Sequence, residues 1–183
     1  MKFLTALAFI ILLAIIARLL FFSFGAQSPS DYAGKGPAFD PLQHLSGPIL
    51  AEGILYGPRG RVTNTFVAEM NGEWDGDAGT LAEEFTYASG MTQSRKWYLT
   101  RAEDGTYSAT ADDIVGPATM EVSGNTLMLR YTIVLPEEGG GQTLNVTDWL
   151  YLTENGTIIN RSQMRKFGVL VAELVATMRP TPE

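Results

Sequence analysis

From Ile49 to the C-terminus, short stretches of alternating apolar and polar residues are separated by turn-forming residues at spacings of about 8–12. This rhythm is typical of an antiparallel β-sandwich or β-barrel, because successive side chains of a strand point to opposite faces. It predicts ten strands. Their expected ranges are 49–56, 61–71, 80–88, 92–101, 106–112, 117–122, 126–135, 142–153, 157–167 and 169–178.

Ten sequential strands in about 135 residues are too many for an open sheet that does not curl. Closure into a barrel removes the exposed edges. We therefore expect an all-β, antiparallel up-and-down barrel over residues 45–183, with a sandwich as the alternative. The dipeptides Asp104-Gly105 and Asn155-Gly156 predict tight two-residue hairpin turns of type I′.

The first 26 residues form a separate segment. Residues 3–24 are apolar apart from Thr5, Arg18 and Ser23, which is long enough for one transmembrane helix. Lys2 precedes this run, so the positive-inside rule places the N-terminus in the cytoplasm and the barrel in the periplasm. The expectation is a single-pass inner-membrane protein, with a cleaved signal peptide as the alternative. Residues 27–44 are rich in Ser, Pro and Gly and are expected to form a linker.

Composition excludes several classes of function. The chain has no cysteine and one histidine, His44, so thiolate metal sites, cysteine nucleophiles and Ser-His-Asp triads are not expected. Without Lys2 and Arg18, 11 basic and 20 acidic residues remain, a net charge of −9. So acidic a domain is not expected to bind nucleic acid. We expect no cofactor or metal, and the sequence does not indicate the oligomeric state.

Polar side chains interrupt strand faces that are otherwise apolar. The residues concerned are the candidate ligand-binding residues Glu83, Arg95, Trp97, Asp148, Arg161 and Arg165. Buried charges need partners, so the two carboxylates are expected to pair with the arginines. One interpretation is an internal network of ion pairs that fixes strand register. Another is the polar end of an apolar ligand cavity. A third is a carboxylate whose raised pKa suits proton transfer. No residue is assigned a catalytic role.

Asp148 allows a sharper expectation. A two-residue turn at Asn155-Gly156 would place Asp148 opposite Gln163, with Arg161 and Arg165 as diagonal neighbours on the same face. The sequence therefore predicts an ion pair between Asp148 and one of these arginines.

Several motifs resemble a known family. They are Glu83-Glu84-Phe85-x-Tyr87, Arg95-x-Trp97, Ala111-Asp112-Asp113-Ile114-Val115-Gly116, Asp148-Trp149-x-Tyr151-Leu152 and Asn160-Arg161-Ser162-x-Met164. In this order they resemble the bacterial domain of unknown function 3833 family. The resemblance implies a lipocalin-like (calycin) barrel in the cell envelope, and relatives that lie near lipid-modifying genes. It implies no reaction. Many members look like lipoproteins, whereas this chain lacks the cysteine that would carry a lipid.

The working expectation is a membrane-anchored envelope protein that binds or handles a lipid-like apolar small molecule inside its barrel. An isomerase or cyclase of calycin type, with Glu83 or Asp148 as acid/base, is the first alternative. A structural or partner-binding protein with a filled core is the second.

Overall fold

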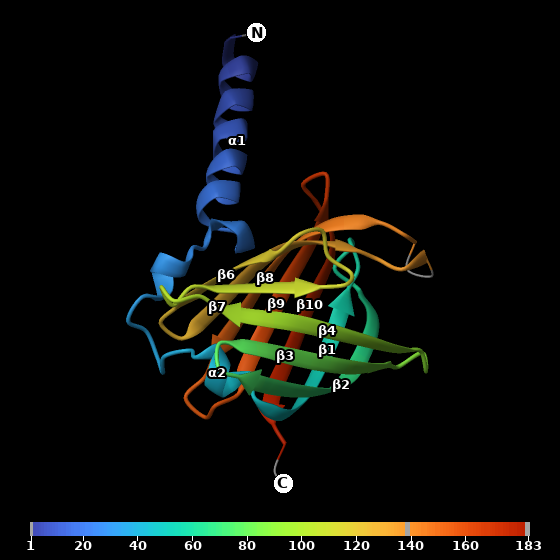
Figure 1. Ribbon diagram of the computed structural model, residues 1–183. Coiled ribbons are helices and arrows are strands. Elements are labelled where there is room, and N and C mark those ends of the chain that lie inside the picture. Colours follow the sequence, from blue (N-terminus) through green and yellow to red (C-terminus); the bar gives the residue numbers. More distant parts are fainter. Residues whose placement is uncertain (1, 138–139, 182–183) are drawn as a thin grey trace.

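The chain forms a barrel of ten antiparallel strands, closed by pairing of its first and last strands (Figure 1). The computed structural model describes residues 2–137 and 140–181. Residues 1 and 183, the expected ends of the N-terminal segment and of the barrel domain, lie outside the described residues. The strands are β1 Gly47–Tyr56, β2 Val62–Asp75, β3 Ala78–Tyr87, β4 Thr92–Arg101, β5 Tyr107–Ala111, β6 Ala118–Ser123, β7 Thr126–Val134, β8 Thr143–Leu152, β9 Ile158–Lys166 and β10 Val169–Pro180. All ten predicted strands are confirmed. Since β1 pairs with β10, the sheet has no free edge and is a barrel, not a sandwich.

Alternation along the strands explains the closed sheet. In β2, every second residue from Phe66 to Gly72 is buried, while Val67, Glu69 and Asn71 are exposed. One face of each strand therefore contributes to a shared interior and the other meets solvent or the N-terminal segment.

The N-terminal run forms α1, Lys2–Phe21, which extends away from the barrel (Figure 1). The expected span reached residue 24, but the chain leaves the helix after Phe21 and forms a short 3₁₀ turn, η1, at Phe24–Ala26. Among the described residues, no helix is both long enough and apolar enough to cross a membrane. The structure thus does not support the expected transmembrane helix.

Residues 27–32 lie against the outer face of β8, although a linker was expected here. The ring of Tyr32, at the end of the 3₁₀ helix η2 (Pro29–Tyr32), lies 5.3 Å from that of Trp149 and 5.6 Å from that of Tyr151. The hydroxyls of Tyr32 and Tyr151 both donate to Gln27 Oε1, at 2.6 and 2.7 Å. This contact covers Trp149, which is 1% exposed.

The following residues close one end of the barrel. The helix α2, Pro41–His44, is flanked by Phe39 and Leu45, which are both buried. Trp74 Nε1 donates to the carbonyl oxygen of Leu45 at 3.2 Å. A Cβ on Gly72 would lie 1.9 Å from that same oxygen, so only glycine permits this approach. These contacts seal the end of the barrel beside α2.

Candidate functional site

The barrel encloses a cavity of about 580 Å³, within the size range of small-molecule sites. Its wall is mostly apolar. The contributing side chains come from strands around the whole barrel and include Phe66, Phe85, Leu129, Leu144, Met164 and Leu174.

The cavity is closed at one end and open at the other. Leu45, beside α2, forms part of the wall at the closed end. The opposite end, where β1, β3, β5, β7 and β9 turn into the next strand, is called the mouth here. Met91 in the β3–β4 turn lines the cavity at the mouth and is 53% exposed. A ligand could enter past this residue without crossing the closed end.

A charged cluster interrupts the apolar wall on β3 and β4. Glu83 and Arg95 are directly opposite each other, and Arg95 Nη1 lies 4.0 Å from Glu83 Oε2. Arg95 was one of the three arginines expected as partners of the carboxylates. The guanidinium of Arg95 makes a two-point contact with Asp113, through Nε at 2.8 Å and Nη2 at 3.1 Å. Its Cζ also lies 4.2 Å from the ring centroid of Trp97, a cation–π distance. Arg95 is therefore bound mainly to Asp113, and Glu83 is held only at long range.

The environment of Glu83 favours its neutral form. Desolvation by burial raises its pKa from the ordinary 4.5 to about 7, against the opposing effect of Arg95 and with smaller contributions from Asp148 and Asp113. The carboxyl group is thus close to half-protonated near neutral pH. It can donate a hydrogen bond as an acid or accept one as a carboxylate.

Asp148 also faces the cavity, on β8. Its Oδ1 accepts hydrogen bonds from Ser162 Oγ at 2.6 Å and from Asn160 Nδ2. Burial raises the pKa of Asp148, and the bonds from Ser162 and Asn160, together with the charge of Arg95, partly offset this effect. The unusual carboxylate on this strand face is therefore partly buried and held by neutral donors.

The predicted pairing of Asp148 with Arg161 or Arg165 is wrong because the register differs by one residue. Asp148 lies opposite Ser162, not Gln163. The β8–β9 loop has three residues, not two: Thr153 N donates to Thr157 O, and Gly156, at φ +80°, is the last loop residue. Since side chains alternate along a strand, a one-residue shift moves every side chain to the other face.

Both arginines consequently lie outside the barrel. Arg161 pairs with Glu173 at 3.0 Å and lies over the ring of Phe24, 5.1 Å from its centroid. Arg165 donates to the carbonyl oxygen of Gly168 at 2.9 Å and to Gln163 Oε1 at 2.8 Å. Neither lines the cavity, whereas Glu83, Arg95, Trp97 and Asp148 all do.

Sequence reasoning missed four polar residues that complete this site: Asp113, Tyr131, Asn160 and Ser162. Asp113 lies in the β5–β6 loop, where strand alternation says nothing about side-chain direction. Tyr131 lines the cavity, and the Cζ of Arg95 lies 5.5 Å from its ring centroid. The motifs Ala111-Asp112-Asp113 and Asn160-Arg161-Ser162, already noted for the family resemblance, contained three of the four.

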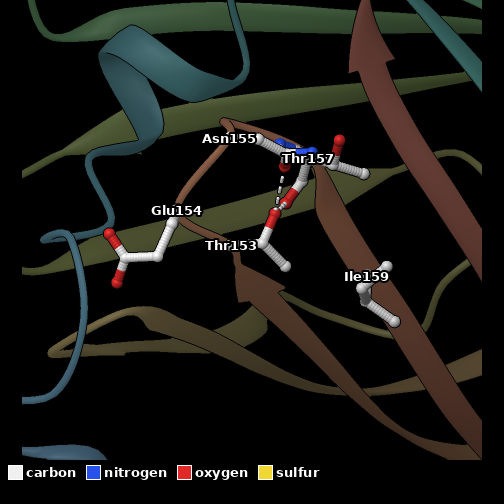
Figure 2. A pocket seen from close by; sticks show the side chains of 5 residues that line it. All are labelled: Thr153, Glu154, Asn155, Thr157 and Ile159. Carbon is white, nitrogen blue, oxygen red and sulfur yellow. Dashed lines mark hydrogen bonds between the residues drawn. The ribbon is translucent and has the colours of Figure 1, made fainter.

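A second hollow lies outside the barrel, at the β8–β9 turn. Figure 2 shows its lining residues Thr153, Glu154, Asn155, Thr157 and Ile159, and the hydrogen bond from Thr153 Oγ1 to Asn155 Oδ1. It is open to solvent and contains a single carboxylate, so it offers no constellation for chemistry. Within residues 2–137 and 140–181, no group of three or more His, Asp or Glu side chains could hold a metal ion.

Comparisons with known proteins identify a family but no activity. No curated protein matches the chain significantly. A crystal structure of a Bacteroides fragilis protein described as having a YmcC-like fold is similar to 79% of this chain and 97% of its own, with 12% identity and a TM-score of 0.36. The family described as "Protein of unknown function (DUF3833)" matches residues 18–180. The chain therefore belongs to the DUF3833 family.

Proposed function

We propose that this protein binds a lipid-like, largely apolar small molecule inside its barrel. The observation that carries the proposal is the cavity of about 580 Å³, which has a mostly apolar wall, one open end and a few polar groups in that wall. Binding sites for small molecules typically combine these properties. The same cavity argues against a purely structural protein with a filled core.

The charges in the wall favour a ligand with a neutral polar group. Three carboxyl groups, on Glu83, Asp113 and Asp148, surround one cation, Arg95, and Asp113 already binds that cation at two points. An anionic head group would be repelled by these carboxyl groups, and Arg95, already bound to Asp113, would not be free to pair with it. An alcohol, ester or amide could exchange hydrogen bonds with Glu83, whose contact with Arg95 is 4.0 Å long.

We also infer a location at the outer side of the cytoplasmic membrane. The support is the apolar run over residues 3–24, preceded by Lys2. In this proposal the N-terminal segment keeps the barrel near the membrane, where apolar molecules are available.

An enzyme is a second candidate, favoured by one observation. Glu83 is buried in the cavity wall with a pKa of about 7, which suits a general acid or base at neutral pH. The isomerase or cyclase alternative assigns the proton transfer to this carboxyl group. It requires chemical change of the bound molecule, whereas the binding proposal requires its recovery unchanged.

The test begins with native mass spectrometry of the purified full chain, which should retain a co-purified apolar molecule. A fluorescent apolar probe should then bind and be displaced by a long-chain fatty alcohol more readily than by the fatty acid at pH 8. Ala172→Trp, which fills space in the cavity wall, should abolish probe binding. Thr177→Trp, which lies on the outward face of the same strand, is the matched control. Equal binding by both variants would contradict a ligand inside the barrel.

A further inference from the structure

The tip of the β9–β10 hairpin presents an aromatic ring to solvent in a conformation that disfavours it. Phe167 and Gly168 form a two-residue turn between the paired residues Lys166 and Val169. Both turn residues have positive φ, +50° for Phe167 and +81° for Gly168. Asn or Gly normally occupies the first position of such a turn, and a bulky residue is strained there. The side chain of Phe167 is nevertheless 91% exposed, so burial within the domain does not explain it.

Unpaired basic residues lie beside this tip. Because β10 pairs with β1, the β9–β10 hairpin and the β1–β2 hairpin are neighbours on the mouth. The first carries Lys166, whose Nζ lies 5.8 Å from the ring centroid of Phe167, and the second carries the exposed Arg59 and Arg61. In the part of the chain that the structure describes, none of these three forms an ion pair. This sector is therefore basic in a domain whose net charge is −9.

Exposed apolar side chains concentrate at the same end of the barrel. Outside the N-terminal segment, nine large apolar residues are exposed among those described, and six of them lie at the mouth. The six are Val62, Met91, Val115, Val134, Phe167 and Val169. The opposite end differs: its β2–β3 and β4–β5 turns carry acidic residues at positions 75, 77, 103 and 104. At the mouth, the β5–β6 and β7–β8 loops also carry acidic residues, Asp112, Asp113 and Glu137. The basic side chains are therefore confined to the sector formed by the β1–β2 and β9–β10 hairpins, where they lie beside the exposed Phe167.

We propose that the mouth of the barrel docks on a lipid bilayer with anionic headgroups, and that Phe167 inserts into the interface while Lys166, Arg59 and Arg61 contact the headgroups. An exposed aromatic ring beside basic side chains suits the boundary between headgroups and acyl chains. Figure 1 shows the β9–β10 tip extending toward the same side of the barrel as α1. Docking through this tip would bring the open end of the cavity close to the membrane. The proposal goes beyond ligand binding and does not depend on it.

Site-specific labelling of the full chain tests the docking directly. Because the chain has no cysteine, Val169→Cys gives a single attachment site for an environment-sensitive fluorophore and leaves Phe167 in place. With vesicles of phosphatidylcholine and phosphatidylglycerol, its emission should shift to the blue, and less so in high salt. The same label at Asp77→Cys, in the β2–β3 turn, should not respond. No response at residue 169, an equal response at both sites, or an equal response to purely neutral vesicles would overturn the proposal.

A second substitution separates membrane insertion from a structural role of Phe167. Phe167→Asn, in the Val169→Cys protein, places a residue that suits positive φ at the tip. It should preserve or raise the melting temperature, yet weaken the vesicle response by about tenfold, the effect expected when one inserted aromatic ring is lost. Tyr98→Ser removes another exposed aromatic side chain and should leave the response unchanged. If Phe167→Asn responds like its parent, insertion of Phe167 is refuted, whatever the outcome of the probe-binding experiments.

Discussion

Replacing Glu83 with glutamine tests whether this carboxyl group is neutral in the folded barrel. Its pKa is about 7 in the folded state and 4.5 ordinarily, so the folded state binds more protons between these values. Stability should therefore fall as pH rises through this window, because the buried group must ionise. The difference of 2.5 between the two pKa values corresponds to about 3 kcal/mol of lost stability at pH 8. Glutamine resembles the neutral acid and cannot ionise, so it removes this loss.

The assay is urea unfolding of the wild type and Glu83→Gln at pH 5 and pH 8. The two proteins should have similar free energies of unfolding at pH 5, whereas the variant should be more stable by about 3 kcal/mol at pH 8. Glu84→Gln is the matched control, since Glu84 is the next residue on β3 and is exposed on the outer face. It should show no such pH-dependent gain. If Glu83→Gln is instead less stable than the wild type at pH 8, the carboxylate is ionised and stabilised by Arg95, and the argument from burial fails.

Three other predictions concern the cavity wall and the location of the domain. Arg95→Gln leaves its carboxylate partners without a cation and should cost about 3 kcal/mol of unfolding free energy, whereas Arg161→Gln, on the outside, should cost about 0–1 kcal/mol. Ser162→Ala removes a donor to Asp148 and should cost about 1–3 kcal/mol, with the cost falling as pH is lowered, because protonation of this carboxyl group, whose pKa burial raises, weakens it as an acceptor; a cost that does not change with pH would contradict an ionised acceptor. If the barrel lies outside the cytoplasm, a membrane-impermeant maleimide should label Asp77→Cys in intact spheroplasts, and labelling only after lysis would contradict that location.

The sequence was sufficient to predict the strands but not every register. Period-two alternation is a local property, so all ten strands could be predicted from it. The Asn155-Gly156 dipeptide, however, fits both a two-residue type I′ turn and a three-residue loop that ends in a positive-φ glycine. In the structure Gly156 has positive φ and Asn155 does not, so the longer loop forms. The one extra residue in this loop shifts the pairing of β8 and β9 by one position, and this shift determines which side chains of β9 face the cavity.

The candidate site was predictable where polar residues interrupt the apolar face of consecutive predicted strands. Glu83 and Arg95 are such a pair, and both lie in the cavity wall. Asp113 was not predictable, because it reaches Arg95 from a loop. The packing of Phe39 and Leu45 at the closed end could not be predicted either, because apolar and polar residues do not alternate regularly around them.

Barrel closure also has a consequence for the order in which the chain can fold. β1 is the first strand of the barrel and pairs with β2, which follows it in the chain. Its other partner is β10, the last strand of the chain. Most strand pairs are local hairpins, whereas this last pairing joins Ile49 to Pro180. During synthesis the hairpins can form in turn, but the cylinder stays open until the C-terminal strand is available. We expect folding to be limited by this long-range step, because closing a long loop costs entropy before any contact is gained.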